Sequence, residues 1–268
     1  MIIYPSFSSS NNEELPTRPT VDQQSSQQSD ASYWAQDVSS LRLSHVPTGA
    51  LNLNVEGRSV FGPLQGFGQL WQKTFRIGLP GCLLSPDEVI TIWKAHFTEF
   101  QPAYNRFFVE GKKIEPGRIM LINASMGGMP VSTGMVVLYS DDVSFTLMTP
   151  QGHPESGWIT FSCAIENGNL VCQIETLARA NDPLNEMVFR FFASNAQDRI
   201  WIHVLEALAA HIPVQGQQVQ SNKLCIDPRW QWSEAKNIFH NAALFTLLYA
   251  LAAPIRWVRR LYRSVAKR

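Results

Sequence analysis

The sequence feature that most constrains the fold is the dipeptide Asn167-Gly168, which lies between two segments rich in alternating apolar residues. Those segments are 157–166 and 169–179. Asn-Gly favours a type I′ turn, because that turn needs positive φ at both central residues. The turn fixes the register of the hairpin, so that Cys163 faces Cys172 and one side of the hairpin carries only apolar side chains. That side is predicted to be buried.

The facing pair Cys163 and Cys172 occupies a non-hydrogen-bonded position, where side chains come close. A disulfide is geometrically conceivable, but two small buried thiols are the favoured interpretation because a reducing, cytoplasmic setting is the default for this chain. The other cysteines, Cys82 and Cys225, form no CxxC pair, so no metal site is expected. The first residues lack the basic start and long apolar run of a secretory signal.

More strands and two helices are predicted around this hairpin. The further strand segments are 70–79, 118–125, 130–140 and 144–150. A helix begins at Pro86, where Ser85 and Glu88 form a capping box, and Pro102 ends it. A long helix over 184–212 follows the last strand. The order is a strand, a helix, a run of antiparallel strands and one long C-terminal helix, which indicates an α+β fold.

Composition divides the rest of the chain. We expect a disordered Ser/Gln-rich leader over 1–35, a connecting segment over 36–57, a folded domain over 58–213, a linker over 214–227 and an apolar, basic helical tail over 228–268. Six of the 22 basic residues follow Pro254, and the body before them is mildly acidic. This distribution argues against a nucleic-acid partner, whose binding face would be basic across the folded domain.

The order of elements resembles the helix-grip fold of the START-like (SRPBCC) superfamily, in which a curved antiparallel sheet wraps around a long C-terminal helix. The segment "TPQGHPESGWITF" at 149–161 is similar to the turn of an uncharacterised family in that superfamily, a domain of unknown function with a Gly-His-Pro-Glu-x-Gly motif between two late strands. That family commonly carries an Arg near the end of its last strand, to which Arg179 corresponds. The resemblance covers roughly 60–212 and implies an apolar cavity for lipids, sterols, aromatic polyketides or similar molecules.

The candidate polar groups of that cavity are His153, Glu155 and Arg179. A turn shaped by the glycines at 152 and 157 is the favoured interpretation of the motif, and direct chemistry is the alternative. Arg179 is expected to pair with Glu155 or another carboxylate. Aromatic residues that would line the cavity, or else form ordinary core, are Trp71, Phe75, Trp93, Phe97, Phe145, Phe161, Phe191 and Trp201.

The tail begins with an apolar stretch over 238–255, which is near the lower limit for spanning a bilayer. An amphipathic basic segment follows, of the kind that lies on anionic lipid. The residues expected to contact the membrane are Trp257, Arg259, Arg260, Leu261 and Arg263. A shallow attachment at the cytoplasmic face is favoured over a span, and the alternative is a helix packed on the domain.

Together these features predict non-catalytic binding of a hydrophobic small molecule or lipid near the cytoplasmic membrane face, with no cofactor. One alternative is an enzyme in which His153 and Glu155 act as acid and base on an aromatic or polyketide-like substrate. Another is a scaffold with a closed core. The presence of a cavity separates the first two functions from the third.

Overall fold

The computed structural model describes residues 31–109, 111, 113–126, 128–214, 216–254 and 256. The chain divides into Met1–Ser32 and Tyr33–Arg268, and the fold below belongs to the second unit. Most of the predicted leader therefore lies outside the described residues. So do the five residues expected to contact a membrane, from Trp257 to Arg263.

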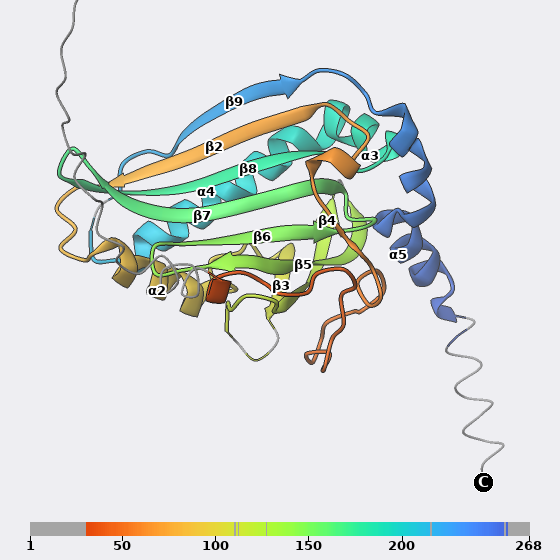
Figure 1. Cartoon of the computed structure of the whole chain (residues 1–268), viewed down its shortest axis with the longest axis horizontal. Coiled ribbons are helices and arrows are strands. Elements are labelled where there is room, and N and C mark those ends of the chain that lie inside the picture. The colour runs from red at the N-terminus through yellow and green to blue at the C-terminus, as the bar shows by residue number, and fades with distance from the viewer. Residues whose placement is uncertain are drawn as a thin grey trace, which may run out of the picture. The chain divides into compact units, whose positions relative to one another are not determined.

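One antiparallel sheet forms the body of this unit, in the order β3-β4-β5-β6-β7-β8-β2-β9, with β1 paired to β6 (Figure 1). The strands are β1 Val60–Phe61, β2 Leu70–Leu79, β3 Asn105–Val109, β4 Ile119–Met126, β5 Met129–Ser140, β6 Ser144–Pro150, β7 Glu155–Glu166, β8 Asn169–Ala180 and β9 Gln220–Asp227. The helices are η1 Pro63–Gln65, α2 Pro86–His96, α3 Pro183–Val188, the π-helix η3 Phe189–Ala193, α4 Ser194–His211, η4 Trp232–His240 and α5 Ala242–Leu251.

The curved sheet holds α4 and α2 against one face, and the main core fills the space between them (Figure 1). Leu205 and Leu208 of α4 are fully buried, as are Trp93 of α2 and Phe161 and Ile174 of the sheet. A large antiparallel sheet wrapped around a long C-terminal helix is the helix-grip arrangement. The predicted α+β fold class is confirmed.

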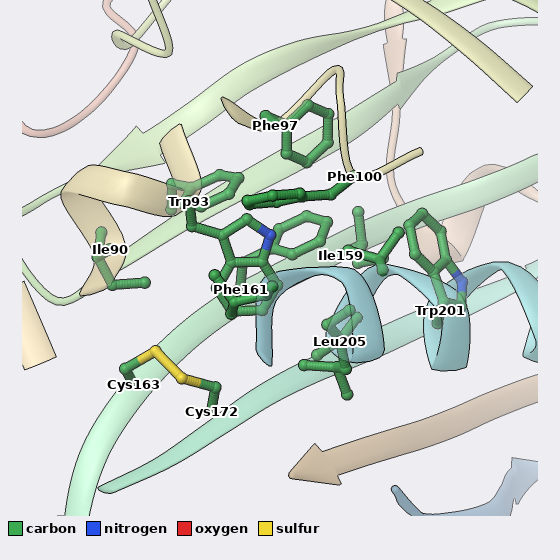
Figure 2. Packing of buried hydrophobic residues seen from close by; sticks show 14 of the residues in the cluster. Ile90, Trp93, Phe97, Phe100, Ile159, Phe161, Cys163, Cys172, Trp201 and Leu205 are labelled. Atoms are coloured by element: carbon green, nitrogen blue, oxygen red, sulfur yellow. A yellow bond between two sulfur atoms is a disulfide. The ribbon is translucent and has the colours of Figure 1, made fainter. Parts of the chain in front are cut away.

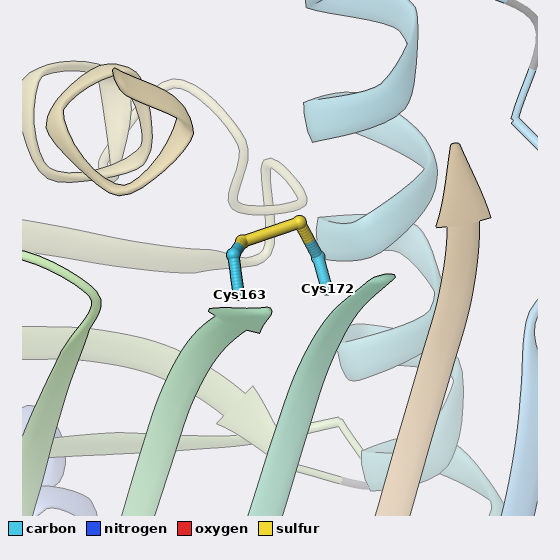
Figure 3. The surroundings of a disulfide bond; sticks show 2 residues. All are labelled: Cys163 and Cys172. Atoms are coloured by element: carbon cyan, nitrogen blue, oxygen red, sulfur yellow. A yellow bond between two sulfur atoms is a disulfide. The ribbon is translucent and has the colours of Figure 1, made fainter. Parts of the chain in front are cut away.

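The hairpin between β7 and β8 has the predicted register. Cys163 pairs with Cys172, and Asn167 and Gly168 have φ values of 50° and 78°. The two cysteines are joined by a disulfide whose sulfur atoms lie on the face of the sheet toward α4 (Figure 3). The favoured interpretation as two free thiols was therefore wrong. The predicted register already placed both side chains on one buried face, close enough to bond. The prediction of free thiols rested only on the assumption of a reducing cellular compartment.

Both predicted helix starts are confirmed, but the helices end differently. Ser85 and Glu88 form the capping box of α2, which ends at His96 before the predicted limit at Pro102. The side chain of Asp182 accepts the N–H groups of Leu184 and Asn185 and so caps α3. The single helix expected over 184–212 is divided by the π-helix η3 into α3 and α4.

The predicted linker over 214–227 is wrong in its second half, because residues 220–227 form the edge strand β9 beside β2. Its side chains are mostly exposed, so the strand lacks the apolar alternation that identifies a half-buried strand. The connecting segment 36–57 packs on the outer face of the sheet, where Leu41 and Val55 are buried with Ile119 and Leu121.

The tail packs against the domain as η4 and α5, which run along one end of the sheet (Figure 1). Buried Asn237 donates to the backbone oxygens of Gln65 and Asn181, at 2.7 and 3.0 Å. Buried Asn241 donates to Asp182 at 2.9 Å and caps α5. Among the described residues, no helix is both long and apolar enough to cross a membrane.

Candidate functional site

Two adjoining cavities lie between the sheet and the start of α4. The inner cavity has a volume of about 120 Å³, and most of its wall is apolar. Its apolar lining includes Phe107, Ile122, Val131, Met135, Ile159 and Ile200. The outer cavity has a volume of about 330 Å³ and a more polar wall. Glu155, Thr176, Ala178 and Phe189 line both cavities, so the two meet at these side chains.

Two polar groups in the wall of the inner cavity have no hydrogen-bond partner among the described residues. They are the indole Nε1 of Trp201 and the hydroxyl of Thr133, and both atoms are buried. A buried donor or acceptor without a partner costs free energy that a bound molecule or water can recover. The inner cavity is therefore apolar with a few hydrogen-bonding points, as small-molecule sites usually are.

The Gly-His-Pro-Glu-x-Gly turn is shaped by close backbone contacts at both ends. Gly152 has φ of 88°, and a Cβ there would lie 2.1 Å from the carbonyl oxygen of His240. Gly157 has φ of 155°, and a Cβ there would lie 2.2 Å from the oxygen of Leu177. Only glycine fits both positions without a shift of the neighbouring backbone. The turn also accepts the N–H of Ala242 on the Gly152 oxygen, at 2.9 Å.

His153 lines the inner cavity with a neutral ring. Its Nδ1 lies 3.0 Å from both the backbone nitrogen and the backbone oxygen of Glu155, so it accepts from the first or donates to the second according to the tautomer. Burial lowers the pKa of His153 to about 4. Near neutral pH the side chain is therefore an uncharged hydrogen-bonding group.

Glu155, at the start of β7, is partly buried and lines both cavities. Burial raises the pKa of its carboxyl group, although Lys73 and Gln197 act in the opposite direction. Gln197 donates to the carboxylate of Glu155, and Lys73 donates to the amide oxygen of Gln197 at 2.6 Å. The amide of Gln197 thus connects a cation to a carboxyl group whose charged form is disfavoured by burial.

Arg179, near the end of β8, lies in the wall of the outer cavity with a side chain only 1 % exposed. Its carboxylate neighbour is Asp227 on β9, at 3.5 Å from Nη2, which fits the expectation that Arg179 pairs with a carboxylate. The expected partner Glu155 is not the one the structure shows. Trp71, on β2, lines the same outer cavity.

The other predicted aromatic residues lie in three kinds of place. The fully buried residues that line neither cavity are Phe75, Trp93, Phe97, Phe145 and Phe161. Four of them have rings in contact with one another, namely Trp93, Phe97, Phe145 and Phe161, and Figure 2 labels Trp93, Phe97 and Phe161. Phe191 is 68 % exposed and lines neither cavity as well. Trp201 is the predicted aromatic residue that reaches the inner cavity. Residue type alone could not separate core from cavity wall.

The sequence reasoning missed three residues that shape the site: Lys73, Gln197 and Phe189. Lys73 carried a signal, because it shares the inward face of its strand with Trp71 and Phe75, and a charged group on such a face needs a buried partner. Gln197 and Phe189 carried no such signal in the sequence. Their positions depend on the π-helix between α3 and α4, which the helical spacing did not reveal.

No family model matches the chain, and no curated protein matches it in sequence. Several solved structures are similar. One is the di-domain ARO/CYC StfQ from the steffimycin biosynthetic pathway, at 10 % identity and a TM-score of 0.39, with 53 % of this chain and 50 % of that chain covered. Another is the major latex-like protein 151 of Panax ginseng, at 16 % identity and a TM-score of 0.38, with 55 % of this chain and 99 % of that chain covered. A third is a START superfamily protein from Mycobacterium smegmatis, at 12 % identity and a TM-score of 0.35, with 54 % of this chain and 97 % of that chain covered.

The chain spans half the length of StfQ and nearly the whole of the other two proteins. Its own sheet and helix give it the helix-grip arrangement. The finer resemblance, to the family with the Gly-His-Pro-Glu-x-Gly turn, has no matching family model and stays a prediction.

Proposed function

We propose that this protein binds a small hydrophobic molecule in the inner cavity and does not convert it chemically. The observation that carries the proposal is an apolar cavity, between sheet and α4, with a few polar groups in its wall. The cavity also argues against the third function, a scaffold, because that function was predicted to go with a closed core.

Native mass spectrometry with lipid extraction, on protein purified from its own host, tests this proposal. We expect a reproducible extra mass that identifies as an apolar molecule. The variant Ala124→Phe places a ring in the inner cavity and should lose that mass. Ala164→Phe is the matched control, because Ala164 is exposed on β7 and lines neither cavity. A clean apo mass for the wild type, with no uptake from a lipid mixture, would contradict binding.

We further propose that the tail holds the protein on an anionic membrane at its cytoplasmic face. The support is the outward face of α5, where Phe245, Leu248 and Leu251 are exposed and form an apolar surface. Arg256 follows directly and stacks on Tyr249 at 3.5 Å. Apolar area and basic charge are the two attractions that bind interfacial helices to anionic lipid.

Co-sedimentation with vesicles tests the membrane proposal. The full chain should bind vesicles that contain phosphatidylglycerol more tightly than vesicles of phosphatidylcholine alone. Leu248→Asp should weaken that binding, because a carboxylate would lie on the apolar face. Leu64→Asp is the control, since Leu64 is also highly exposed but belongs to η1. Equal sedimentation of all three proteins, or none at all, would remove the membrane from the proposal.

A cavity enzyme is the second candidate, favoured by one observation: His153 and Glu155 both line the inner cavity, and burial shifts the pKa of each toward the neutral form. A neutral imidazole and a protonated carboxyl group can exchange protons with an aromatic or polyketide-like substrate. If His153→Ala abolishes turnover of such a substrate and retains its binding, the protein is an enzyme. Binding without turnover by the wild type supports the first proposal.

A further inference from the structure

The outer cavity carries more positive than negative charge. Its wall contains four cations, Lys73, Arg179, Arg190 and Lys223. Lys73 and Lys223 share one carboxylate, that of Asp198. Arg190 lies 3.8 Å from Glu186, whose carboxylate also accepts from Trp230. The remaining acid in the wall is Glu155, whose charged form is disfavoured by burial.

Arg179 is the cation whose hydrogen bonds are least satisfied. A guanidinium has five N–H donors, yet Nε and Nη1 of Arg179 are buried and make no hydrogen bond to any described residue. Nη2 reaches Asp227 only at 3.5 Å. The Asp227 carboxylate is closer to Arg229, whose Nε lies 2.9 Å from its Oδ1. The hydrogen bond from Arg229 is the main reason that the pKa of Asp227 is lowered to about 2.

The Arg179 side chain is also held in place by its surroundings. Its Cγ would lie 2.6 Å from a Cβ at Gly66, and the Ser156 Cβ would lie 2.9 Å from the same point. The strand β8 continues directly into buried Asn181 and Asp182, which the tail contacts. Arg179 is therefore a buried, positioned guanidinium with two unpaired N–H groups behind the cavity wall, and an anion in the outer cavity would supply the opposite charge that this group lacks.

We propose that the outer cavity binds the anionic end, a carboxylate or a phosphate, of an amphipathic molecule whose apolar part lies in the inner cavity, with Arg179 as the principal positive charge behind its wall. This inference rests on the proposed binding function and names the class of ligand. Glu155 and Phe189 line both cavities, so a molecule that spans the two would pass these side chains.

A series of four probes with one alkyl chain and different ends tests the proposal on the full chain. Decanoate, decyl phosphate, decanol and decylamine are titrated by calorimetry, or through the fluorescence of Trp158 and Trp201 in the cavity wall. We expect decanoate or decyl phosphate to bind about ten- to a hundredfold more tightly than decanol, as for hydrogen bonds to a charged group. The tighter of the two identifies the anion. Decylamine should bind most weakly.

Arg179→Gln should remove the preference for an anion while decanol binding stays the same. Arg229→Gln is the matched control: it removes a guanidinium that contacts the same Asp227 but does not line the outer cavity. If Arg179→Gln does not fold, Lys223→Gln serves in its place, since Lys223 is partly exposed in the cavity wall. It should reduce the preference for an anion several-fold.

The outcomes separate this inference from the function it rests on. Equal binding of decanol and the anions to the wild type overturns the anion site and leaves hydrophobic binding intact. The same holds if the anion preference survives in both Arg179→Gln and Lys223→Gln. Failure of every probe to bind, together with a clean apo mass from the host, overturns the binding function itself.

Discussion

At the scale of single residues, His153 makes the stability of the fold depend on pH. Its pKa is about 4 in the folded protein, because burial disfavours the charged ring, against 6.5 in the unfolded chain. The unfolded chain thus binds more protons in this range. The stabilisation is complete above pH 6.5 and is lost as the pH falls toward 4, by about 3 kcal/mol at most.

His153→Asn removes this titration and keeps a hydrogen-bonding group near the position of Nδ1, which contacts the backbone nitrogen and oxygen of Glu155. Between pH 7 and pH 4 the free energy of unfolding should therefore fall less in the variant than in the wild type. Urea denaturation at several pH values measures it. His203→Asn, on the exposed side of α4, controls for the loss of an imidazole. Parallel pH curves for His153→Asn and the wild type would contradict the assignment.

At the scale of elements, the turn at 151–157 and the tail depend on each other through Gly152. Gly152→Ala should destabilise the fold by more than about 2 kcal/mol, because the new Cβ would meet the His240 oxygen and φ is positive. Gly168→Ala is the control, since φ there is also positive but nothing lies near the Cβ. Limited proteolysis should cut the tail faster in Gly152→Ala alone. Similar digestion of both variants would mean that the contact does not hold the tail.

The hairpin of β7 and β8 gives the second prediction at this scale. The disulfide between Cys163 and Cys172 closes a short loop, so we expect it to stabilise the folded state by about 2 kcal/mol. Under denaturing conditions without reductant, thiol titration should find the two cysteines Cys82 and Cys225 and no more. Urea unfolding of the wild type with and without reductant measures the stabilisation. In the double variant Cys163→Ala/Cys172→Ala, the reductant should not change the free energy of unfolding. Four titratable thiols would contradict the bond.

The same elements show what sequence could predict. Strands with one buried face could be predicted from the alternation of apolar residues, and the Asn-Gly turn fixed the register of β7 and β8. Both features depend on residues close together in the sequence. β9 was missed because its exposed side chains follow no apolar pattern and its pairing with β2 is non-local. In the site, the motif led to His153 and Glu155. Gln197 could not be found, because its place depends on the π-helix that precedes α4.

At the scale of the whole Tyr33–Arg268 unit, the tail, the turn and the inner cavity form one connected path. Asn241 binds Asp182 and starts α5, whose Ala242 donates to the Gly152 oxygen. The turn that Gly152 begins carries His153 into the inner cavity. A molecule in that cavity favours the conformation in which the turn is ordered. By linkage, it should also favour the docked tail, and loss of docking should weaken binding by the same factor.

Asn241→Ala tests this coupling, because it removes the bond to Asp182 and the cap of α5 together. We expect decanoate affinity to fall several-fold, and in the wild type we expect decanoate to slow hydrogen exchange at 237–246. Asn123→Ala is the control, since its side chain bonds the backbone of Gly49 away from both cavities. If Asn241→Ala frees the tail in hydrogen exchange and decanoate still binds as before, tail and cavity are independent. The membrane contact proposed for the tail would then be independent of the ligand.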